Sequence, residues 1–240
     1  MVKIGGLTLG KIPRVALVLS SQKDLNFVKK AKARGIDILE VRIDKLKNIN
    51  KEPVLKFIKA VKKTGLPVIA TVRSRAEGAL KNIADNKRLE LLEAVLPLVN
   101  AVDIELSSKT ILKKIVKKAR TFKKKVIISY HNFKRTPTDK DLESLINRAG
   151  TAGADIVKIA VQPKNKKDVI RLMNWTLKHK HKNLIIIAMG AQGAISRVVF
   201  PFIGSILTYA CISKAVAPGQ IPLDVLNQQL KLFCSNRKVH

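Results

Sequence analysis

Residues 155–161 read Asp-Ile-Val-Lys-Ile-Ala-Val, an apolar run of strand length that one charged side chain, Lys158, interrupts. The run is continuous rather than alternating, which is typical of a parallel strand covered on both faces. Seven further runs rich in Val and Ile recur along the chain, at residues 15–19, 36–41, 67–72, 101–106, 126–130, 184–189 and 205–212. The sequence therefore predicts eight parallel strands.

The segments between these runs show helical spacing. The clearest example is the i, i+3, i+4, i+7 stripe Val54, Phe57, Ile58 and Val61. Thr138 with Asp141 three residues later has the spacing of a capping box and predicts a helix start. Strand starts lie roughly 20–35 residues apart, enough for a strand and a returning helix. Eight such units predict a (β/α)₈ barrel; an open doubly wound sheet is the alternative, but the chain lacks its dinucleotide-binding glycine fingerprint.

A length of 240 residues allows one large domain or two small ones. No linker rich in Gly, Ser or Pro divides the chain, so we expect residues 1–240 to form a single barrel domain. Within the first dozen residues, the strand-like stretch 7–10 lies between Gly5-Gly6 and Pro13, which predicts a short extra β-hairpin.

The composition sets the class of protein. Hydrophobic residues make up 46% of the chain, which excludes general disorder, and aromatics only 4%, which argues against a stacking surface. Lys and Arg number 47 against 17 Asp and Glu, a net charge of +30. This charge predicts salt-sensitive, non-specific attraction to polyanions such as nucleic acid. The lysine pairs 113–114 and 117–118 suit either a membrane-surface helix or a solvated outer helix of the barrel, and we favour the latter.

Cys211 and Cys234 make neither a disulfide framework nor a metal site, and we expect both thiols to be reduced. We find no convincing secretory signal. The longest uncharged apolar stretch, residues 198–212, contains Pro201 and Gly204 and is too short to span a membrane. The expectation is a soluble cytoplasmic protein with no membrane partner.

Ionisable residues lie at the ends of five consecutive predicted strands. They are Glu40 with Arg42, Arg73, Asp103 with Glu105, His131 and Lys158. Active sites of barrels lie at the carboxyl ends of the strands. Because burying an unpaired charge costs several kcal/mol, this placement indicates a site rather than chance.

Lys158 allows two interpretations. Loss of water and nearby cations would favour a neutral amine that attacks a carbonyl group. The alternative is a structural ion pair with Glu105 or Asp103. A lone His131 is more often structural than catalytic, but an iminium at the same barrel mouth would need a base.

Three arginines could bind a substrate carboxylate through two parallel hydrogen bonds: Arg42, Arg73 and Arg197. They could equally pair with protein carboxylates, with Glu40, Glu77 and Glu105 as the candidates.

Seven segments in order, spanning nearly the whole chain, resemble the type I 3-dehydroquinate dehydratase family. They are residues 40–44, 70–73 with Glu77-Gly78, 129–131, 155–161, 189–190, 196–197 and 217–222. The resemblance implies a (β/α)₈ barrel that acts as a carbon-oxygen lyase. It would convert 3-dehydroquinate to 3-dehydroshikimate and water through a lysine Schiff base, the third step of the shikimate pathway. No metal or organic cofactor is implied.

The resemblance also implies residue roles. Lys158 would form the imine, His131 would move protons and Glu77 would orient His131. The substrate-contacting positions would be Ser20, Glu40, Arg42, Arg73, Met189, Arg197 and Gln220. The family usually has Ser directly before Ala-Pro-Gly-Gln, where this chain has Val216, so we expect weaker substrate binding or a changed lid contact but the same reaction.

Two other functions remain as alternatives. Another Schiff-base barrel, such as a class I aldolase, would need a glycine-rich phosphate cradle after strands seven and eight, and residues 189–193 offer some glycine there. A basic nucleic-acid-binding protein is the distant third, because interleaved aromatics and a known module are lacking. The oligomeric state is open, with a homodimer as one option.

Overall fold

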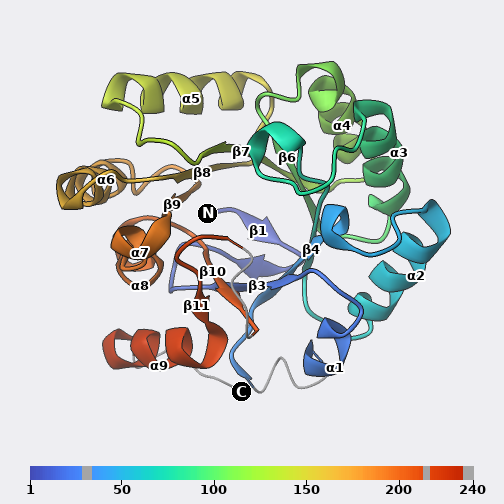
Figure 1. Ribbon diagram of the computed structural model, residues 1–240, viewed down its shortest axis with the longest axis horizontal. Coiled ribbons are helices and arrows are strands. Elements are labelled where there is room, and N and C mark those ends of the chain that lie inside the picture. The colour runs from blue at the N-terminus through green and yellow to red at the C-terminus, as the bar shows by residue number, and fades with distance from the viewer. Residues whose placement is uncertain (29–33, 213–216, 235–240) are drawn as a thin grey trace.

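The structure is a computed structural model and describes residues 1–28, 34–212 and 217–234. Helices surround a curled parallel sheet (Figure 1). Its strands are β3 (Val15–Leu19), β4 (Ile38–Arg42), β5 (Val68–Thr71), β6 (Ala101–Glu105), β7 (Lys125–Asn132), β8 (Ile156–Val161), β9 (Leu184–Ala188), β10 (Thr208–Cys211) and β11 (Ile221–Pro222). All eight predicted strands are present as β3 to β10, with ends that differ by a few residues.

The sheet closes on itself between β9 and β10. Its strands are hydrogen-bonded in the order β11-β10-β3-β4-β5-β6-β7-β8-β9. Leu184 at the start of β9 forms a parallel bridge with Ser205, just before β10. The Ile206 amide also donates to the Leu184 carbonyl at 2.8 Å. These contacts complete the ring from β3 to β10, so the predicted (β/α)₈ barrel is confirmed.

The helices lie outside the ring (Figure 1). They are α1 (Asp24–Val28), α2 (Lys51–Lys62), α3 (Asp85–Val95), α4 (Lys109–Thr121), α5 (Asp139–Thr151), α6 (Lys166–Lys178), α7 (Gly190–Gly193), α8 (Ser196–Ile203) and α9 (Leu223–Phe233). The short 3-10 turns η2 (Ile43–Lys45) and η3 (Arg75–Glu77) follow β4 and β5. The predicted stripe on α2 is buried, and α5 begins with the predicted capping box of Thr138 and Asp141.

The inside of the barrel has two halves. Alternate strand residues point inward. Near the strand starts, the inward residues are apolar and buried; they include Ala16, Ile38, Ile69, Ala101, Ile127, Ile156 and Ile185. Further along the same strands, the inward positions carry the buried polar side chains Glu40, Asp103 and Lys158. The amino-terminal half is therefore a packed core, and the carboxyl-terminal half is available for chemistry.

The predicted hairpin is present and closes the amino-terminal end of the barrel. Its strands β1 (Lys3–Ile4) and β2 (Leu7–Thr8) pair antiparallel. Gly5 and Gly6 make the turn at φ 55° and 85°, a region that glycine adopts without steric cost. Ile4 and Leu9 are almost fully buried in the inner apolar cluster. The hairpin thus supplies the floor of the barrel core.

Two other expectations concern the surface. Helix α4 buries Ile111, Ile115 and Ala119 and turns its lysines outward, so it is an outer barrel helix. Both cysteines are free thiols, with Cys211 buried. Across the described residues, we find no helix of the length and apolar character needed to cross a membrane.

The hairpin floor yields a stability prediction. Ile4→Ala should lower the free energy of unfolding by about 2–5 kcal/mol, because it leaves a cavity in a packed core. The control Lys3→Ala, at an exposed position one residue away, should change it by less than about 0.5 kcal/mol. Urea titration measures both. Equal effects of the two substitutions would show that the hairpin is not part of the core.

Candidate active site

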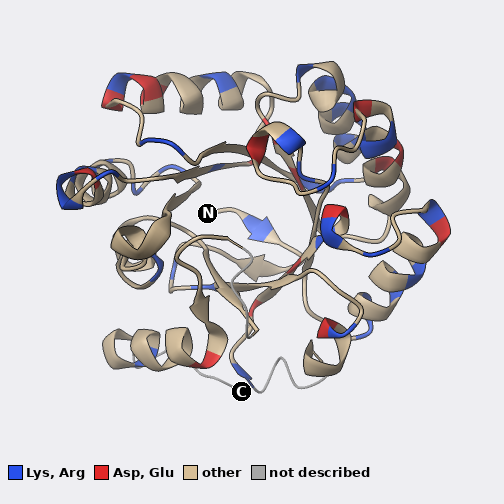
Figure 2. Cartoon of the chain, in the orientation of Figure 1, with Lys and Arg blue, Asp and Glu red and all other residues tan. Residues whose placement is uncertain are grey.

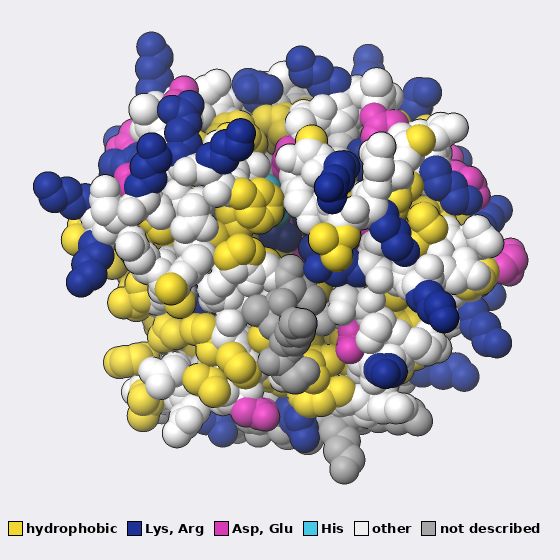
Figure 3. All heavy atoms as spheres, viewed as in Figure 1, with side chains coloured by type: hydrophobic (Ala, Val, Ile, Leu, Met, Phe, Trp, Pro, Cys, Tyr) yellow, Lys and Arg dark blue, Asp and Glu magenta, His cyan; other side chains and the backbone are white. Residues whose placement is uncertain are grey.

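A cavity open to solvent lies at the carboxyl ends of the barrel strands. Figure 3 looks onto this face, where a hollow near the centre shows basic side chains. Its walls carry all the predicted site residues except Ser20: Glu40, Arg42, Arg73, Glu77, His131, Lys158, Met189, Arg197 and Gln220. Ser20 directly follows β3, and its amide donates to the Asp24 carboxylate of α1 at 2.7 Å. Val216 lies outside the described residues.

Lys158 is buried among carboxylates. Its Nζ lies 3.0 Å from Asp103 Oδ2 and 3.4 Å from Glu40 Oε2. The ring centroid of Tyr209 lies 4.4 Å from the same nitrogen, within cation–π range. The lysine thus makes the ion pair with Asp103 that the sequence allowed, with Glu40 rather than Glu105 as the second partner. Its closest charged partners are therefore anions and not the cations expected from the sequence.

Asp103 is held as an anion. Burial by itself raises the pKa of this carboxyl group, but the charges of Arg73 and Lys158 outweigh burial and hold the pKa well below its usual range. Ser129 Oγ also donates to Asp103 Oδ1 at 2.6 Å. A permanent negative charge therefore lies beside the Lys158 nitrogen.

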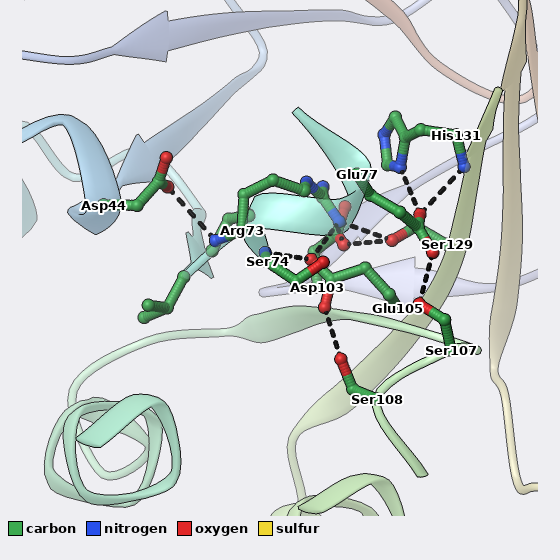
Figure 4. Close-up of polar contacts among 12 residues, drawn as sticks. Asp44, Arg73, Ser74, Glu77, Asp103, Glu105, Ser107, Ser108, Ser129 and His131 are labelled. Atoms are coloured by element: carbon green, nitrogen blue, oxygen red, sulfur yellow. Dashed lines mark hydrogen bonds and ion pairs between the residues drawn. The ribbon is translucent and has the colours of Figure 1, made fainter. Parts of the chain in front are cut away.

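His131 is fixed by Glu77. One carboxylate oxygen of Glu77 lies 2.9 Å from both the Nδ1 and the backbone amide of His131 (Figure 4). The other oxygen accepts from Ser107 Oγ. Because an ionised carboxylate can only accept, Nδ1 carries the proton and Nε2 is left as a base.

The pKa values of this pair are displaced in opposite directions. Burial, together with the charges of Arg73 and Lys158, lowers the pKa of His131 well below its usual value. Burial raises the pKa of Glu77 to about 7, against the opposing effect of its hydrogen bond from Ser107. The imidazole is therefore neutral at physiological pH, while the carboxylate that orients it titrates close to that pH.

Arg73 links two acids of the barrel wall. Its guanidinium lies 3.0 Å from Asp103 and 2.8 Å from Glu105, and it donates to Ser129 (Figure 4). On the far side, Glu105 pairs with Arg88 of α3, which is almost fully buried and donates to the Val72 carbonyl. Although burial raises the pKa of Glu105, the two arginines outweigh it and lower that pKa. Glu105 is thus an anion clamped between two cations.

The other two arginines differ in their partners. Arg42 forms a two-point pair with Asp44, at 2.8 and 2.9 Å. Arg197 instead donates to the carbonyl groups of Gly219 and Pro218, at 2.7 and 3.1 Å. In the part of the chain that the structure describes, no carboxylate lies within ion-pair distance of Arg197. Burial lowers its pKa to about 10, so a buried cation without a protein anion faces the cavity.

Residues 217–222 cover one side of the cavity. Ile221 and Pro222 of β11 pair with β10 in parallel register. Gly219, at φ 71°, comes so close to the Gly190 carbonyl that a Cβ atom at this position would clash. A Cβ at Gly193 would likewise meet Ala188 of β9. Gly193 after β9 and Gly219 after β10 therefore serve close packing, which weakens the case for a phosphate cradle.

Several site residues were not predicted from the sequence. Tyr209 lies under Lys158 and Phe133 lines the cavity, while Ser107 and Arg88 support Glu77 and Glu105 from behind. The alternation of residues 205–212 could have placed Tyr209 inside the barrel. The spacing of the chain gives no such signal for Arg88, because its carboxylate partner comes from another element.

A buried lysine beside a carboxylate-oriented histidine, at the mouth of a barrel, defines the class of Schiff-base-forming (β/α)₈ lyases. Residues 15–237 match the family model described as type I 3-dehydroquinase. The chain therefore belongs to the type I 3-dehydroquinase family.

Individual relatives agree with this assignment. The chain is 44% identical to a 3-dehydroquinate dehydratase of Methanosarcina acetivorans over 97% of its own length and 100% of that protein. The crystal structure of the 3-dehydroquinate dehydratase from Aquifex aeolicus superposes with a TM-score of 0.82 at 37% identity, covering 92% of this chain and 98% of the other. A type I enzyme from Clostridium difficile, solved with covalently modified comenic acid, gives 0.89 at 30% identity, with 98% and 97% covered.

The Glu105 clamp predicts a specific pattern of stability. Arg88→Met should lower the free energy of unfolding by about 3–5 kcal/mol, because Glu105 keeps its buried charge but loses one of its two cations. Adding Glu105→Gln in the same chain should recover part of that loss, since the charge is then gone. Chemical denaturation of the single and double variants measures this coupling. A double variant less stable than Arg88→Met alone would contradict the clamp.

Proposed function

We propose that the chain is a 3-dehydroquinate dehydratase, which removes water from 3-dehydroquinate to give 3-dehydroshikimate in the shikimate pathway of aromatic amino acid biosynthesis. The observation that carries the proposal is Lys158, buried 3.0 Å from Asp103 in the cavity that also holds His131 on Glu77. Family membership and the names of the relatives support it.

In the first step, the Lys158 ammonium gives one proton to Nε2 of His131, and the resulting amine attacks the substrate ketone. A carbon–nitrogen bond forms, His131 returns its proton to the former carbonyl oxygen, which leaves as water, and a protonated imine remains. The new positive charge lies where the lysine charge lay before. Asp103 at 3.0 Å and the Tyr209 ring at 4.4 Å are already in place to stabilise it.

In the second step, Nε2 of His131 removes a proton from the carbon next to the imine. The electron pair of that bond moves into the iminium and gives an enamine. The enamine then expels the hydroxyl group one carbon further along, and the His131 imidazolium returns its proton so that water leaves. Glu77 stabilises the imidazolium between these transfers. Hydrolysis of the imine uses one water and releases product and free Lys158.

Substrate binding falls to the remaining wall residues. Arg197 has no carboxylate partner among the described residues and takes the substrate carboxylate, while Gly219 and Pro218 hold its plane through their carbonyl groups. Glu40, Arg42 and Gln220 supply hydrogen bonds to hydroxyl groups, and Met189 forms an apolar wall. Arg73 directs its donors to Asp103 and Glu105, so it acts on the substrate through Asp103.

Three further properties are part of the proposal. Residues 1–240 form one domain, which is supported by the single sheet that joins β3 to β10. The enzyme works in the cytoplasm, as its two free thiols suggest. It forms a homodimer through exposed apolar side chains of α8 and α9, namely Phe202, Leu232 and Phe233.

A trapping experiment tests the Schiff base. Borohydride added with 3-dehydroquinate should leave a reduced adduct on Lys158, detected by peptide mass spectrometry. His131→Ala should still form the adduct but lose about 10²–10⁴-fold in turnover, because it removes only the acid–base group. Lys158→Met should form none, whereas the exposed control Lys113→Met should behave like the parent. An adduct on a surface lysine, or no adduct, would refute the mechanism.

The pH profile tests the role of Glu77. With its pKa raised to about 7, Glu77 gains a proton as the pH falls and no longer accepts from Nδ1, so kcat should decline below about pH 7. His131 does not set this limb, because its own pKa is far lower. Glu77→Gln should reduce kcat about 10–100-fold and move the limb to more acidic pH. The control Glu93→Gln on α3 should leave the acidic limb of the kcat profile at the same pH. If the limb does not move in Glu77→Gln, a group other than Glu77 causes it.

A further inference from the structure

The acidic residues are unevenly distributed along the barrel axis. Six helices carry an acidic residue in their first turn: Asp24, Glu52, Asp85, Asp139, Asp168 and Asp224. First turns follow the carboxyl ends of the strands, so these acids lie on the side of the cavity. Five more acids are buried: Glu40, Asp44, Glu77, Asp103 and Glu105. The opposite pole, where the helices end, therefore has little negative charge.

The acids near that pole are already paired. Asp37 pairs with Arg14 at 2.7 Å. Asp155 pairs with Arg120 and Lys125, at 2.6 and 3.0 Å. The lysines at the ends of α2 and α4 make no ion pair with a carboxylate within the described ranges of the chain. Their charge is open to an external anion.

We call the lysines at the ends of α2 and α4 the basic strip: Lys59, Lys62, Lys63, Lys117, Lys118, Lys123 and Lys124. Helix α3 lies between α2 and α4 and has no basic residue in its last turn. Lys124 spans this gap, since its Nζ lies 3.5 Å from the Pro97 carbonyl at the end of α3. Burial and the charge of Lys62 lower the pKa of Lys124, so α2 and α4 bring their charges together. Figure 2 shows basic segments along both helices on the same side of the barrel.

Lys123 adds an independent observation. It has φ 53°, the only positive φ of a non-glycine residue among those described. Its amide donates to the Arg120 carbonyl at 2.9 Å and the Lys124 amide to the Ala119 carbonyl at 2.8 Å, which closes the end of α4. Glycine is the usual residue at this point of a helix end, because a Cβ atom is disfavoured there. The chain instead holds a cation in an unfavourable conformation at the tip of the strip.

We propose that the basic strip binds the phosphate backbone of nucleic acid. Lysine offers a compact charge that suits phosphate contacts without reading base edges. Phe122 is the one large apolar side chain exposed within the described residues of the α4 end, too little for insertion into a lipid surface. The strip lies at the pole opposite the cavity, so bound nucleic acid leaves the cavity open. The proposal does not rest on the proposed function.

The first test uses matched charge neutralisation. Binding of labelled single-stranded RNA and DNA, each of about 20 nucleotides, is followed by fluorescence anisotropy over a salt series. Lys62→Gln/Lys124→Gln should make the slope of log affinity against log salt shallower by about 1 to 1.5, because two phosphate contacts are lost. The control Lys140→Gln/Lys166→Gln removes the same charge from the first turns of α5 and α6 and should leave the slope unchanged. Equal effects of both pairs would overturn the site.

The arms of the same experiment separate the anionic partners. Similar affinity for RNA and DNA supports backbone contact, and a preference for either assigns the natural partner. The proposal would be overturned if neither nucleic acid binds while anionic phospholipid vesicles bind in a way that depends on Lys62 and Lys124. Turnover of 3-dehydroquinate should be the same in all these variants, because the strip is remote from the cavity.

The second test separates binding from folding. Lys123→Gly should raise Tm, because it relieves the positive φ, yet it should weaken nucleic-acid binding several-fold. Lys123→Arg should keep both the binding and the Tm of the parent, since it retains the charge and the Cβ atom. A fall in Tm for Lys123→Gly, or undiminished binding, would overturn the role given to Lys123.

Discussion

The ion pair between Lys158 and Asp103 is the contact on which the rest of the barrel interior depends. A charge removed from water costs several kcal/mol unless an opposite charge replaces the lost hydration. Asp103 meets that need at 3.0 Å, but it then requires cations of its own, which Arg73 and Lys158 supply. Arg73 in turn requires Glu105, and Glu105 requires Arg88. One buried amine thus sets the identity of side chains as far away as α3.

The parts of this arrangement that depend on local pattern could be predicted from the sequence. Eight Val- and Ile-rich runs gave the barrel strands. Lys158 stood out because its neighbours are apolar, and His131 because it is the only histidine of the sequence at a predicted strand end. The role of Glu77 came from family resemblance and not from spacing. Partners could not be predicted, because Arg42 meets Asp44, and Lys158 meets Glu40, only once register and side-chain rotamers are fixed. Ser20, expected near the substrate, directly follows β3 and donates its amide to Asp24 of α1.

The same strands serve stability at one end and chemistry at the other. Ile38 and Glu40 lie two residues apart on β4, yet the first packs in the apolar floor and the second contacts Lys158. The hairpin that covers the floor is formed by the chain before the first barrel strand. Because the apolar half supplies stability, the polar half can tolerate the cost of buried charge. This division explains why the costly buried charges gather at the mouth.

Arg197 joins two functions in one side chain. It donates to the carbonyl groups of Gly219 and Pro218 and also faces the cavity as a cation that no carboxylate of the described residues pairs with. The position of residues 217–220 and the affinity for an anionic ligand are therefore thermodynamically linked, and such a linkage is reciprocal. A ligand that binds the Arg197 guanidinium stabilises the position of residues 217–220. A sequence change that destabilises this position weakens the binding of the anion by the same free energy. Substitutions in this loop can thus tune affinity without touching a ligand atom.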